Sequence, residues 1–279
     1  MLTITGVTGR TGGAIAESLL ANGTAVRVVV RKLADVERWR ALGAHVAVAD
    51  FLDERALTHA LAGSDALFAL LPEDLSVPDF HAHRRRMADA LAVSVRAARV
   101  PHVVFLSSLA AAAPAGPARD LRHAEDALAA TGCKLLILRA AFFQDNLAAA
   151  IAVAREHGMF ASFLPTEDTA IAMVATADVA ALVTACLMHP AARGGVVEVV
   201  GPAYSSAQVA EQLGRALDRS LDVVTIPPLG QLDFLRRVGV PPAFAQALVE
   251  LYAWLGAPRT PSSALSVTGT TTLAETLDR

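Results

Sequence analysis

Cysteine is scarce in this chain, which has only Cys133 and Cys186 among its 279 residues. Both lie in apolar segments, and neither belongs to a Cys-x-x-Cys pair or a Cys/His cluster. Cysteines in such positions are typically small buried side chains. We therefore expect neither a disulfide nor a metal site, and a reducing cytoplasm fits this cysteine usage.

Long apolar runs and an excess of charge are missing as well. The chain is 54% hydrophobic, but no uninterrupted apolar run approaches the roughly 18 residues that a bilayer span needs. It begins directly with a predicted strand, which leaves no room for a signal peptide. The net charge of −3 lacks the basic excess of nucleic-acid-binding proteins. These features predict a cytoplasmic protein with no membrane or nucleic-acid partner.

Glycine, in contrast, is concentrated at the start, where residues 1–13 read MLTITGVTGRTGG. The order is a short apolar strand, a glycine turn and a segment with helical spacing. Such a turn lets a diphosphate approach bare amides at a helix N-terminus, although a strand-to-helix turn without a ligand is the simpler alternative. The residues expected to hold a dinucleotide here are Gly6, Thr8, Gly9, Arg10, Thr11 and Gly12.

Strand-like and helix-like segments alternate through the first half of the chain. Apolar strands are expected at 25–30, 45–49, 66–71, 102–108 and 134–140, with helices at 54–61, 79–99 and 119–130 among the segments between them. Nearly continuous apolar strands alternating with helices indicate a parallel sheet covered on both faces. The predicted class is α/β, a Rossmann-type doubly wound fold.

The alternation loosens beyond residue 141. We expect a helix over 142–158, strands at 195–202 and 221–228, and an amphipathic helix within 205–219 with Ser205 or Ser206 as its N-cap. This divides the chain into a dinucleotide-binding domain, 1–150, and a smaller C-terminal α/β part, 151–279. The smaller part is expected to cover the substrate at the carboxyl edge of the sheet and to form one compact unit with the first.

Two basic residues, Arg31 and Lys32, end the second predicted strand, where a dinucleotide fold faces the adenosine ribose. Basic groups there pair with a 2′-phosphate, whereas an acid would accept hydrogen bonds from a 2′-hydroxyl. Arg10 can approach the same phosphate from the glycine turn. The expected cofactor is therefore NADP(H), unless Arg31 and Lys32 are only a solvated strand end.

Two further strand ends are expected to contact the cofactor. Asp50 can accept a hydrogen bond from the adenine amino group while Phe51 flanks the ring, or Asp50 can simply cap the helix that starts near Asp53. The fourth strand should pass beneath the adenosine or diphosphate with Leu70, Leu71 and Pro72.

The segments GVTGRTGG, VVVRK, VADFLD, HVVFLSS, RHAEDALAATGCKLLILRAAFFQDNL, TADVAALV and GPAYSSAQVAEQL follow one another along the chain. In this order they resemble NmrA-like proteins, atypical members of the short-chain dehydrogenase/reductase superfamily that include type-2 quinone oxidoreductase-like enzymes. The resemblance covers nearly the whole chain. It implies a Rossmann fold, NADP(H) binding, and either reductase activity or redox sensing.

One catalytic feature of the wider superfamily is absent. Its reductases use a Tyr followed four residues later by a Lys, but Tyr204 and Tyr252 are the only tyrosines here and neither has that lysine. The best-matching positions are Ala118 and Arg122. Arg122 is expected to hold the nicotinamide ribose or a phosphate, or else to pair with Glu125 or Asp126. At the end of the preceding strand, Ser107 is expected to contact the cofactor and Ser108 the substrate.

The missing pair restricts the acceptor. Quinones, azo compounds and conjugated double bonds delocalise the developing anion and need little help with protonation. Otherwise histidine is the remaining side chain that titrates near pH 7. The candidates are His81 and His83, which open the helix over 79–99, and His123 beside Arg122; each can equally be a surface or capping residue.

Substrate contacts are expected where the chain leaves the strand at 134–140. Phe142, Phe143, Gln144 and Asn146 combine aromatic bodies with amide groups, which suits a flat ligand with polar edges, although at least one of the two phenylalanines must be core if the segment is helical. Phe160 and Phe163 are expected to add a lid.

Three functions follow from these features. The leading hypothesis is an NADPH-dependent oxidoreductase that transfers hydride to a quinone or a similar conjugated small molecule. The alternatives are a non-catalytic NADP(H)-binding redox sensor that acts through a protein partner, and a non-redox enzyme on the same fold. The sequence leaves a homodimer open.

Overall fold

The structure, a computed structural model, describes residues 1–113, 118–190, 194–258 and 264–278. Its first half alternates strands and helices as the sequence predicts. Short 3-10 turns lie at Leu33–Asp35 and Leu109–Ala112. The regular elements are β1 (Leu2–Ile4), α1 (Arg10–Ala21), β2 (Val26–Val30), α2 (Val36–Ala41), β3 (His45–Val48), α3 (Glu54–Leu61), β4 (Ala66–Ala69), α4 (Phe80–Ala97), β5 (His102–Ser108), α5 (Arg119–Ala129) and β6 (Lys134–Ala140).

The second half adds shorter elements. They are β7 (Phe142–Phe143), a 3-10 helix (η3, Gln144–Ala150), α6 (Ile151–His157), β8 (Met159–Ser162), β9 (Ala170–Val174), α7 (Thr176–Met188), β10 (Gly195–Val200), β11 (Ala203–Ser205), α8 (Ser206–Ala216), β12 (Asp222–Thr225), α9 (Pro228–Arg237), α10 (Pro242–Leu255), β13 (Leu265–Thr268) and α11 (Leu273–Leu277). The single helix expected over 142–158 is therefore wrong: only its last two turns are α-helical, because β7 pairs with β9 first.

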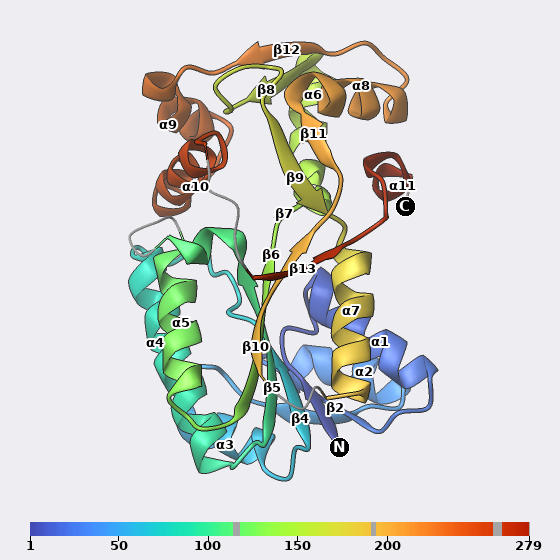
Figure 1. The fold of residues 1–279 in the computed structure, drawn as a ribbon, viewed down its shortest axis with the longest axis vertical. Helices are drawn as coiled ribbons and strands as arrows, with labels where there is room; N and C mark the ends of the chain where they lie inside the picture. Colours follow the sequence, from blue (N-terminus) through green and yellow to red (C-terminus); the bar gives the residue numbers. More distant parts are fainter. Residues whose placement is uncertain (114–117, 191–193, 259–263, 279) are drawn as a thin grey trace.

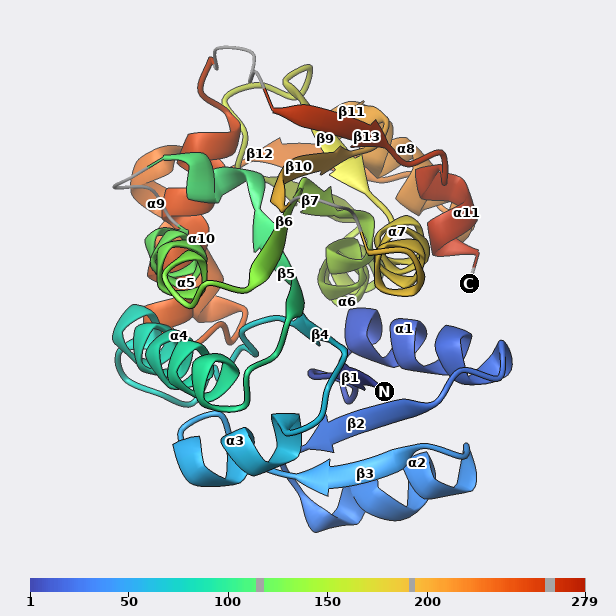
Figure 2. The ribbon, with the colours of Figure 1, turned by 60° about the horizontal axis from the view of Figure 1, so that its bottom comes forward.

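Eight parallel strands form the main sheet in the order β13-β10-β6-β5-β4-β1-β2-β3. The strand order reverses between β1 and β4, where ligands bind in open α/β sheets. Figure 2 shows β3 at one edge of this sheet and β13 at the other. The predicted Rossmann-type doubly wound fold is confirmed.

Helices cover both faces of the main sheet (Figure 1). One face packs against α1, α2 and α7 through buried side chains such as Leu19, Trp39 and Val183. The other packs against α3, α4 and α5 through Leu57, Leu91 and Leu128. Because both faces are covered, the central strands carry continuous apolar sequence rather than alternation.

The boundary of the main sheet does not coincide with residue 150. The strands β7, β8 and β9 belong to two smaller sheets. The chain then comes back to the main sheet with α7 and β10, and β13 joins that sheet from near the C-terminus. The remaining elements form a smaller part above the carboxyl edge of the sheet in Figure 1, with its own core of residues such as Leu147, Phe160 and Leu213. The chain thus crosses between the two parts several times.

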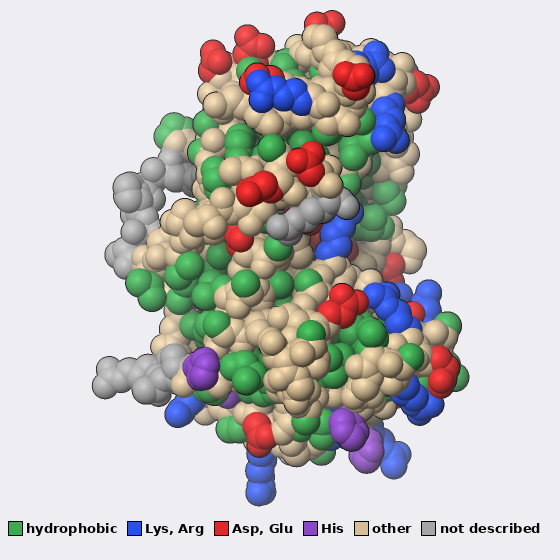
Figure 3. Space-filling view, turned by 90° about the vertical axis from the view of Figure 1, so that its right-hand side faces the viewer, with side chains coloured by type: hydrophobic (Ala, Val, Ile, Leu, Met, Phe, Trp, Pro, Cys, Tyr) green, Lys and Arg blue, Asp and Glu red, His purple; other side chains and the backbone are tan. Residues whose placement is uncertain are grey.

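The outer surface has no dominant charge on the face drawn in Figure 3, where basic and acidic side chains are interspersed. None of the helices in the described ranges is long and apolar enough to cross a membrane.

Candidate active site

The glycine turn joins β1 to α1 at the point where the strand order reverses. Gly6 has a φ of +67°, which favours glycine, and its carbonyl accepts the Gly9 N–H at 3.0 Å. A Cβ on Gly12 would lie 2.4 Å from the Gly6 oxygen, so only glycine lets α1 start this close to the strand. A Cβ on Gly9 would meet only that oxygen, at 3.4 Å, and Gly9 is otherwise exposed.

The first turn of α1 is prepared for an anion. Gly9 is its N-cap, no side chain caps the turn, and no acidic residue lies in it. By comparison, Asp53 caps α3 by accepting the Ala56 N–H at 2.9 Å. Uncapped amides at the positive end of a helix dipole bind phosphate. The residues present therefore fit the diphosphate of a dinucleotide.

Arg10 ties this turn to the segment that follows β7. Its guanidinium donates to the backbone carbonyl of Asp145 at 2.9 Å, and the Asp145 carboxylate accepts the Thr176 N–H, at the start of α7, at 2.9 Å. Arg10 is exposed. Thr8 and Thr11 lie in the same turn, the former exposed and the latter half-buried.

Arg31 and Lys32 directly follow β2, and both are exposed. The Arg31 guanidinium lies 3.6 Å from the carboxylate of Asp74, which belongs to the loop between β4 and α4. The structure thus brings an acid, which the sequence reasoning did not consider, to the basic strand end.

The end of β3 corrects two expectations. Asp50 is exposed and accepts the Leu52 N–H at 2.8 Å, whereas Asp53 caps α3, so the interpretation of Asp50 as that cap is wrong. Phe51 is 8% exposed and packs in the core with Leu57, so its ring is not free to flank an adenine.

The end of β4 lies beside the glycine turn. Leu70 packs so closely that a Cβ on Gly6 would be 3.0 Å from it. Leu71 points to the opposite face of the sheet and is core, and Pro72 is half-buried. Of these three, Leu70 is the side chain that the structure brings to the turn.

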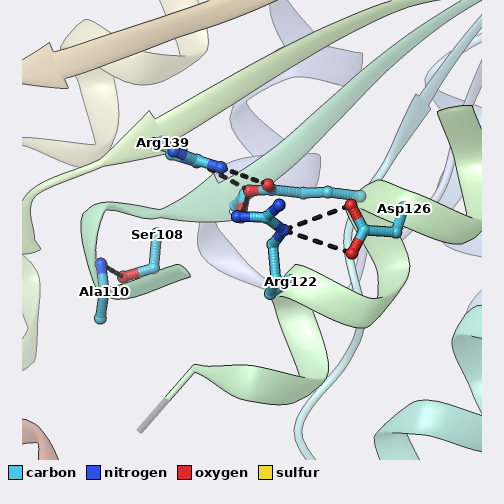
Figure 4. A network of polar contacts seen from close by, with 7 residues as sticks. Ser108, Ala110, Arg122, Asp126 and Arg139 are labelled. Atoms are coloured by element: carbon cyan, nitrogen blue, oxygen red, sulfur yellow. Dashed lines mark hydrogen bonds and ion pairs between the residues drawn. The ribbon is translucent and has the colours of Figure 1, made fainter. Parts of the chain in front are cut away.

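A buried ion pair lies beneath the ends of β5 and β6 (Figure 4). Glu125 is 3% exposed and binds the Arg139 guanidinium in bidentate fashion, at 3.0 and 2.6 Å. Ser107, expected to contact the cofactor, is 4% exposed and donates its hydroxyl proton to Glu125 at 2.6 Å, so that proton is already engaged within the protein. The hydrogen bonds that Arg139 donates to Glu125 raise the pKa of Arg139, although burial opposes this shift.

Ser108 and Arg122 lie near this pair but do not join it (Figure 4). The Ser108 hydroxyl is half-buried and accepts the Ala110 N–H at 3.2 Å. Arg122 pairs with Asp126, one turn later on α5, at 3.2 Å. Of the two partners considered for Arg122, Glu125 is occupied by Arg139 and Asp126 is the one used.

The three candidate histidines lie in different surroundings. His123 pairs with Asp89 at 2.6 Å, and both side chains are exposed. His83 is half-buried on α4 and lies near Asp74, whose pKa is lowered chiefly by hydrogen bonds from Ser76. His81, in the first turn of α4, lies with Nδ1 2.9 Å from the buried carboxylate of Asp120.

Asp120 also pairs with Arg84, at 3.0 Å. Burial raises the pKa of Asp120, but the hydrogen bond to His81 and the charge of Arg84 outweigh it and leave that pKa below its usual value. The Nε2 atom of His81 is buried and has no hydrogen-bond partner among the described residues. Asp120 therefore fixes the ring and leaves one nitrogen unused.

The side chains of the segment after β6 differ in their exposure to solvent. Gln144 is fully buried: its amide nitrogen donates to the Thr271 carbonyl at 3.0 Å, and its oxygen accepts from Thr276 at 2.5 Å. It anchors the C-terminal segment and is not free for a substrate. Asn146 is exposed, and both Phe142 and Phe143 are half-buried.

An aromatic cluster lies above this exit. Phe163 stacks on Tyr252 with ring centroids 5.0 Å apart, and Phe142 lies 6.0 Å from the same ring. Burial raises the pKa of Tyr252 to about 12, so the phenol is protonated at neutral pH. Phe160, expected in a lid, is 9% exposed and packs in the core of the smaller part, where it lines the same small cavity as Phe142 and Phe163.

The sequence did not indicate Tyr252 as a residue of the site. It lies far along the chain from the segment expected to contact the substrate, in helix α10, which carries no recognised motif. The cluster surrounds a cavity of about 30 Å³. Within the described residues, no group of His, Cys, Asp or Glu is arranged to hold a metal ion.

Comparison with known proteins identifies the family of this chain. The sequence profile of the NmrA-like family matches residues 1–274. The chain is 32% identical to quinone oxidoreductase 2 of Escherichia coli over 90% of its own length and 86% of that protein. It is 28% identical to an NAD(P)H azoreductase of Xenophilus azovorans over 91% of its length and 86% of the relative.

Solved structures have the same fold. An NADPH-dependent quinone oxidoreductase from Escherichia coli, in complex with NADPH, superposes with a TM-score of 0.84 at 27% identity, covering 100% of this chain and 99% of that one. The triphenylmethane reductase of Citrobacter sp., at 19% identity and a TM-score of 0.82, covers 99% and 98% of the two chains and shares the fold.

Proposed function

This chain belongs to the NmrA-like family, and we propose that it is an NADPH-dependent reductase of quinones or similar conjugated small molecules. The observation that carries the proposal is an open, uncapped glycine turn in a chain that lacks the Tyr–Lys pair. The similarity to a quinone oxidoreductase and an azoreductase over most of both chains supports the acceptor class.

Different residues are expected to bind the diphosphate, the 2′-phosphate and the acceptor. Gly6, Gly9 and Gly12 give the diphosphate access to the first-turn amides of α1. Arg31 and Lys32 face the adenosine ribose and bind a 2′-phosphate. When bound, NADPH supplies a hydride to the acceptor. The half-buried rings of Phe142 and Phe163 offer flat apolar surface to that acceptor.

The acceptor class follows from the absence of the Tyr–Lys pair. Ala118 occupies the position of the usual tyrosine, and Arg122, which stays charged, cannot act as an acid near neutral pH. A quinone takes up hydride as a delocalised anion, so the proton can arrive afterwards. We assign its delivery to His81: Asp120 orients the ring, and the buried Nε2, which has no hydrogen-bond partner among the described residues, donates once the acceptor or a water bound with it reaches that atom.

The test is oxidation of NADPH, followed at 340 nm, with a panel of quinones and azo dyes. We expect turnover with the quinones and none with simple ketones, whose alkoxide needs an acid. His81→Gln should bind NADPH like the parent protein and lower turnover about tenfold or more at neutral pH. His123→Gln, which removes an exposed histidine, is the matched control and should leave turnover unchanged.

An NADPH oxidation rate equal to that without enzyme across the whole panel would contradict the proposal. Tight dinucleotide binding in the same preparation would then favour a redox sensor. If His81→Gln and His123→Gln turn over equally, proton delivery by His81 is wrong while the reductase function stands.

A further inference from the structure

The carboxylate of Asp74 lies against the residue that should select the cofactor. We propose that Asp74 is a second determinant of dinucleotide choice, which opposes the 2′-phosphate at Arg31 and thereby admits NADH to the same site. The inference rests on the proposed function, because it requires Arg31 to face the adenosine ribose.

The topology explains how the two residues meet. In the sheet order, β4 and β2 flank β1, so the loop that follows β4 must pass the glycine turn to reach the end of β2. Leu70 begins this passage against Gly6, and Asp74 completes it 3.6 Å from the Arg31 guanidinium. The contact therefore lies at the edge of the dinucleotide crevice, on the adenosine side.

Asp74 is held in place. Its carboxylate accepts the backbone N–H of Ser76 at 3.0 Å and the Ser76 hydroxyl at 2.5 Å, and its side chain is 28% exposed. These hydrogen bonds, with the charges of Arg31 and His83, lower the pKa of Asp74. At neutral pH the loop thus presents a fixed negative charge rather than a mobile surface acid.

A fixed carboxylate has opposite consequences for the two cofactors. It repels a 2′-phosphate and competes with it for Arg31, whereas it can accept a hydrogen bond from a 2′-hydroxyl. Arg31 and Lys32 act in the other direction. NADPH keeps an advantage that is smaller than two basic residues alone would give, and NADH is not excluded.

The experiment measures binding of two probes that differ only in the 2′-phosphate, 2′,5′-ADP and 5′-AMP, to the full chain by calorimetry. Asp74→Asn should raise the affinity for 2′,5′-ADP about fivefold and should not raise that for 5′-AMP. The effect should shrink in high salt, because the contact is partly exposed. The ratio of kcat/KM for NADPH to that for NADH should rise by a similar factor.

Glu73→Gln is the matched control: it removes one charge from the same loop at an exposed position and should change either affinity by less than about twofold. Arg31→Ala should weaken 2′,5′-ADP by about tenfold or more. If Arg31→Ala leaves 2′,5′-ADP binding unchanged, the placement of the cofactor at β2 is wrong. If Arg31→Ala behaves as expected but Asp74→Asn changes neither probe, or both equally, only the role of Asp74 is overturned.

Discussion

At the scale of single residues, the glycine turn is where a methyl group has the largest effect. A Cβ added to Gly12 would lie 2.4 Å from a backbone oxygen. A Cβ added to Gly9 would fit without a clash, and Gly9 is exposed. The two glycines therefore serve different ends: Gly12 lets the helix meet the strand, and Gly9 lets a ligand meet the helix.

Substitution by alanine separates these two ends. Gly12→Ala should lower the free energy of unfolding by roughly 1–3 kcal/mol because the backbone must shift, and NADPH binding should be lost with it. Gly9→Ala should change stability by less than about 1 kcal/mol and raise the Kd for NADPH about tenfold or more. Thermal unfolding without dinucleotide and a fluorescence titration with NADPH measure the two effects. A Gly9→Ala protein that binds NADPH like the parent would show that nothing approaches this amide.

At the scale of elements, a buried ion pair joins α5 to the sheet. Glu125 on α5 reaches Arg139 on β6 and Ser107 on β5, and the register places Ser107 directly beside Arg139. Arg139 also lies opposite Glu198 of β10. The helix, and with it Arg122 at the expected cofactor edge, is oriented by largely buried contacts.

Glu125→Gln should leave the Arg139 charge without its counter-charge and lower the free energy of unfolding by about 3 kcal/mol, or about 8 °C in Tm. Asp126→Asn is the control from the same helix, because it breaks the exposed pair with Arg122 and should cost less than about 0.5 kcal/mol. Circular dichroism melts of the two variants decide the matter. Equal melting temperatures for both would mean that the buried pair contributes no more than the exposed one.

At the scale of the whole molecule, stability should depend on pH through a histidine remote from the site. His102 begins β5, is 4% exposed, and has its pKa lowered below 6.5 by burial. The unfolded chain binds the proton near pH 6.5, and the fold binds it only at lower pH. The unfolded state therefore holds more protons between these values, and stability falls as the pH drops below about 6.5.

Denaturant unfolding between pH 7.5 and pH 5 checks this expectation. His102→Leu removes the titrating group and should flatten the decline relative to the parent protein. Carboxylates such as Asp120 contribute only at lower pH, because the pKa of Asp120 is lowered below 3.8 in the fold. Parallel declines in the parent and the variant would assign the pH dependence to other groups.

The strand–helix alternation and the glycine turn are local features of the sequence, and they predicted the fold of the first half and an expected site for the cofactor. Apolar strands alternating with helices leave few arrangements other than a doubly wound sheet, and the glycine spacing is a local property of a few residues. The same local reasoning identified Arg31 at a strand end and noted the absence of the Tyr–Lys pair. Such features depend on neighbours in the chain, which the sequence shows directly.

Which of these side chains are free to meet a ligand depends on contacts between distant parts of the chain. Gln144 is hydrogen-bonded to Thr271 and Thr276, and Ser107 donates to Glu125. Phe51 packs in the core. Each of these residues nevertheless has the residue type and sequence position of a ligand contact. The return of β10 and β13 to the main sheet, and the meeting of Asp74 with Arg31, likewise join residues far apart in sequence. Burial and long-range pairing depend on how separate elements pack, and no local pattern records that.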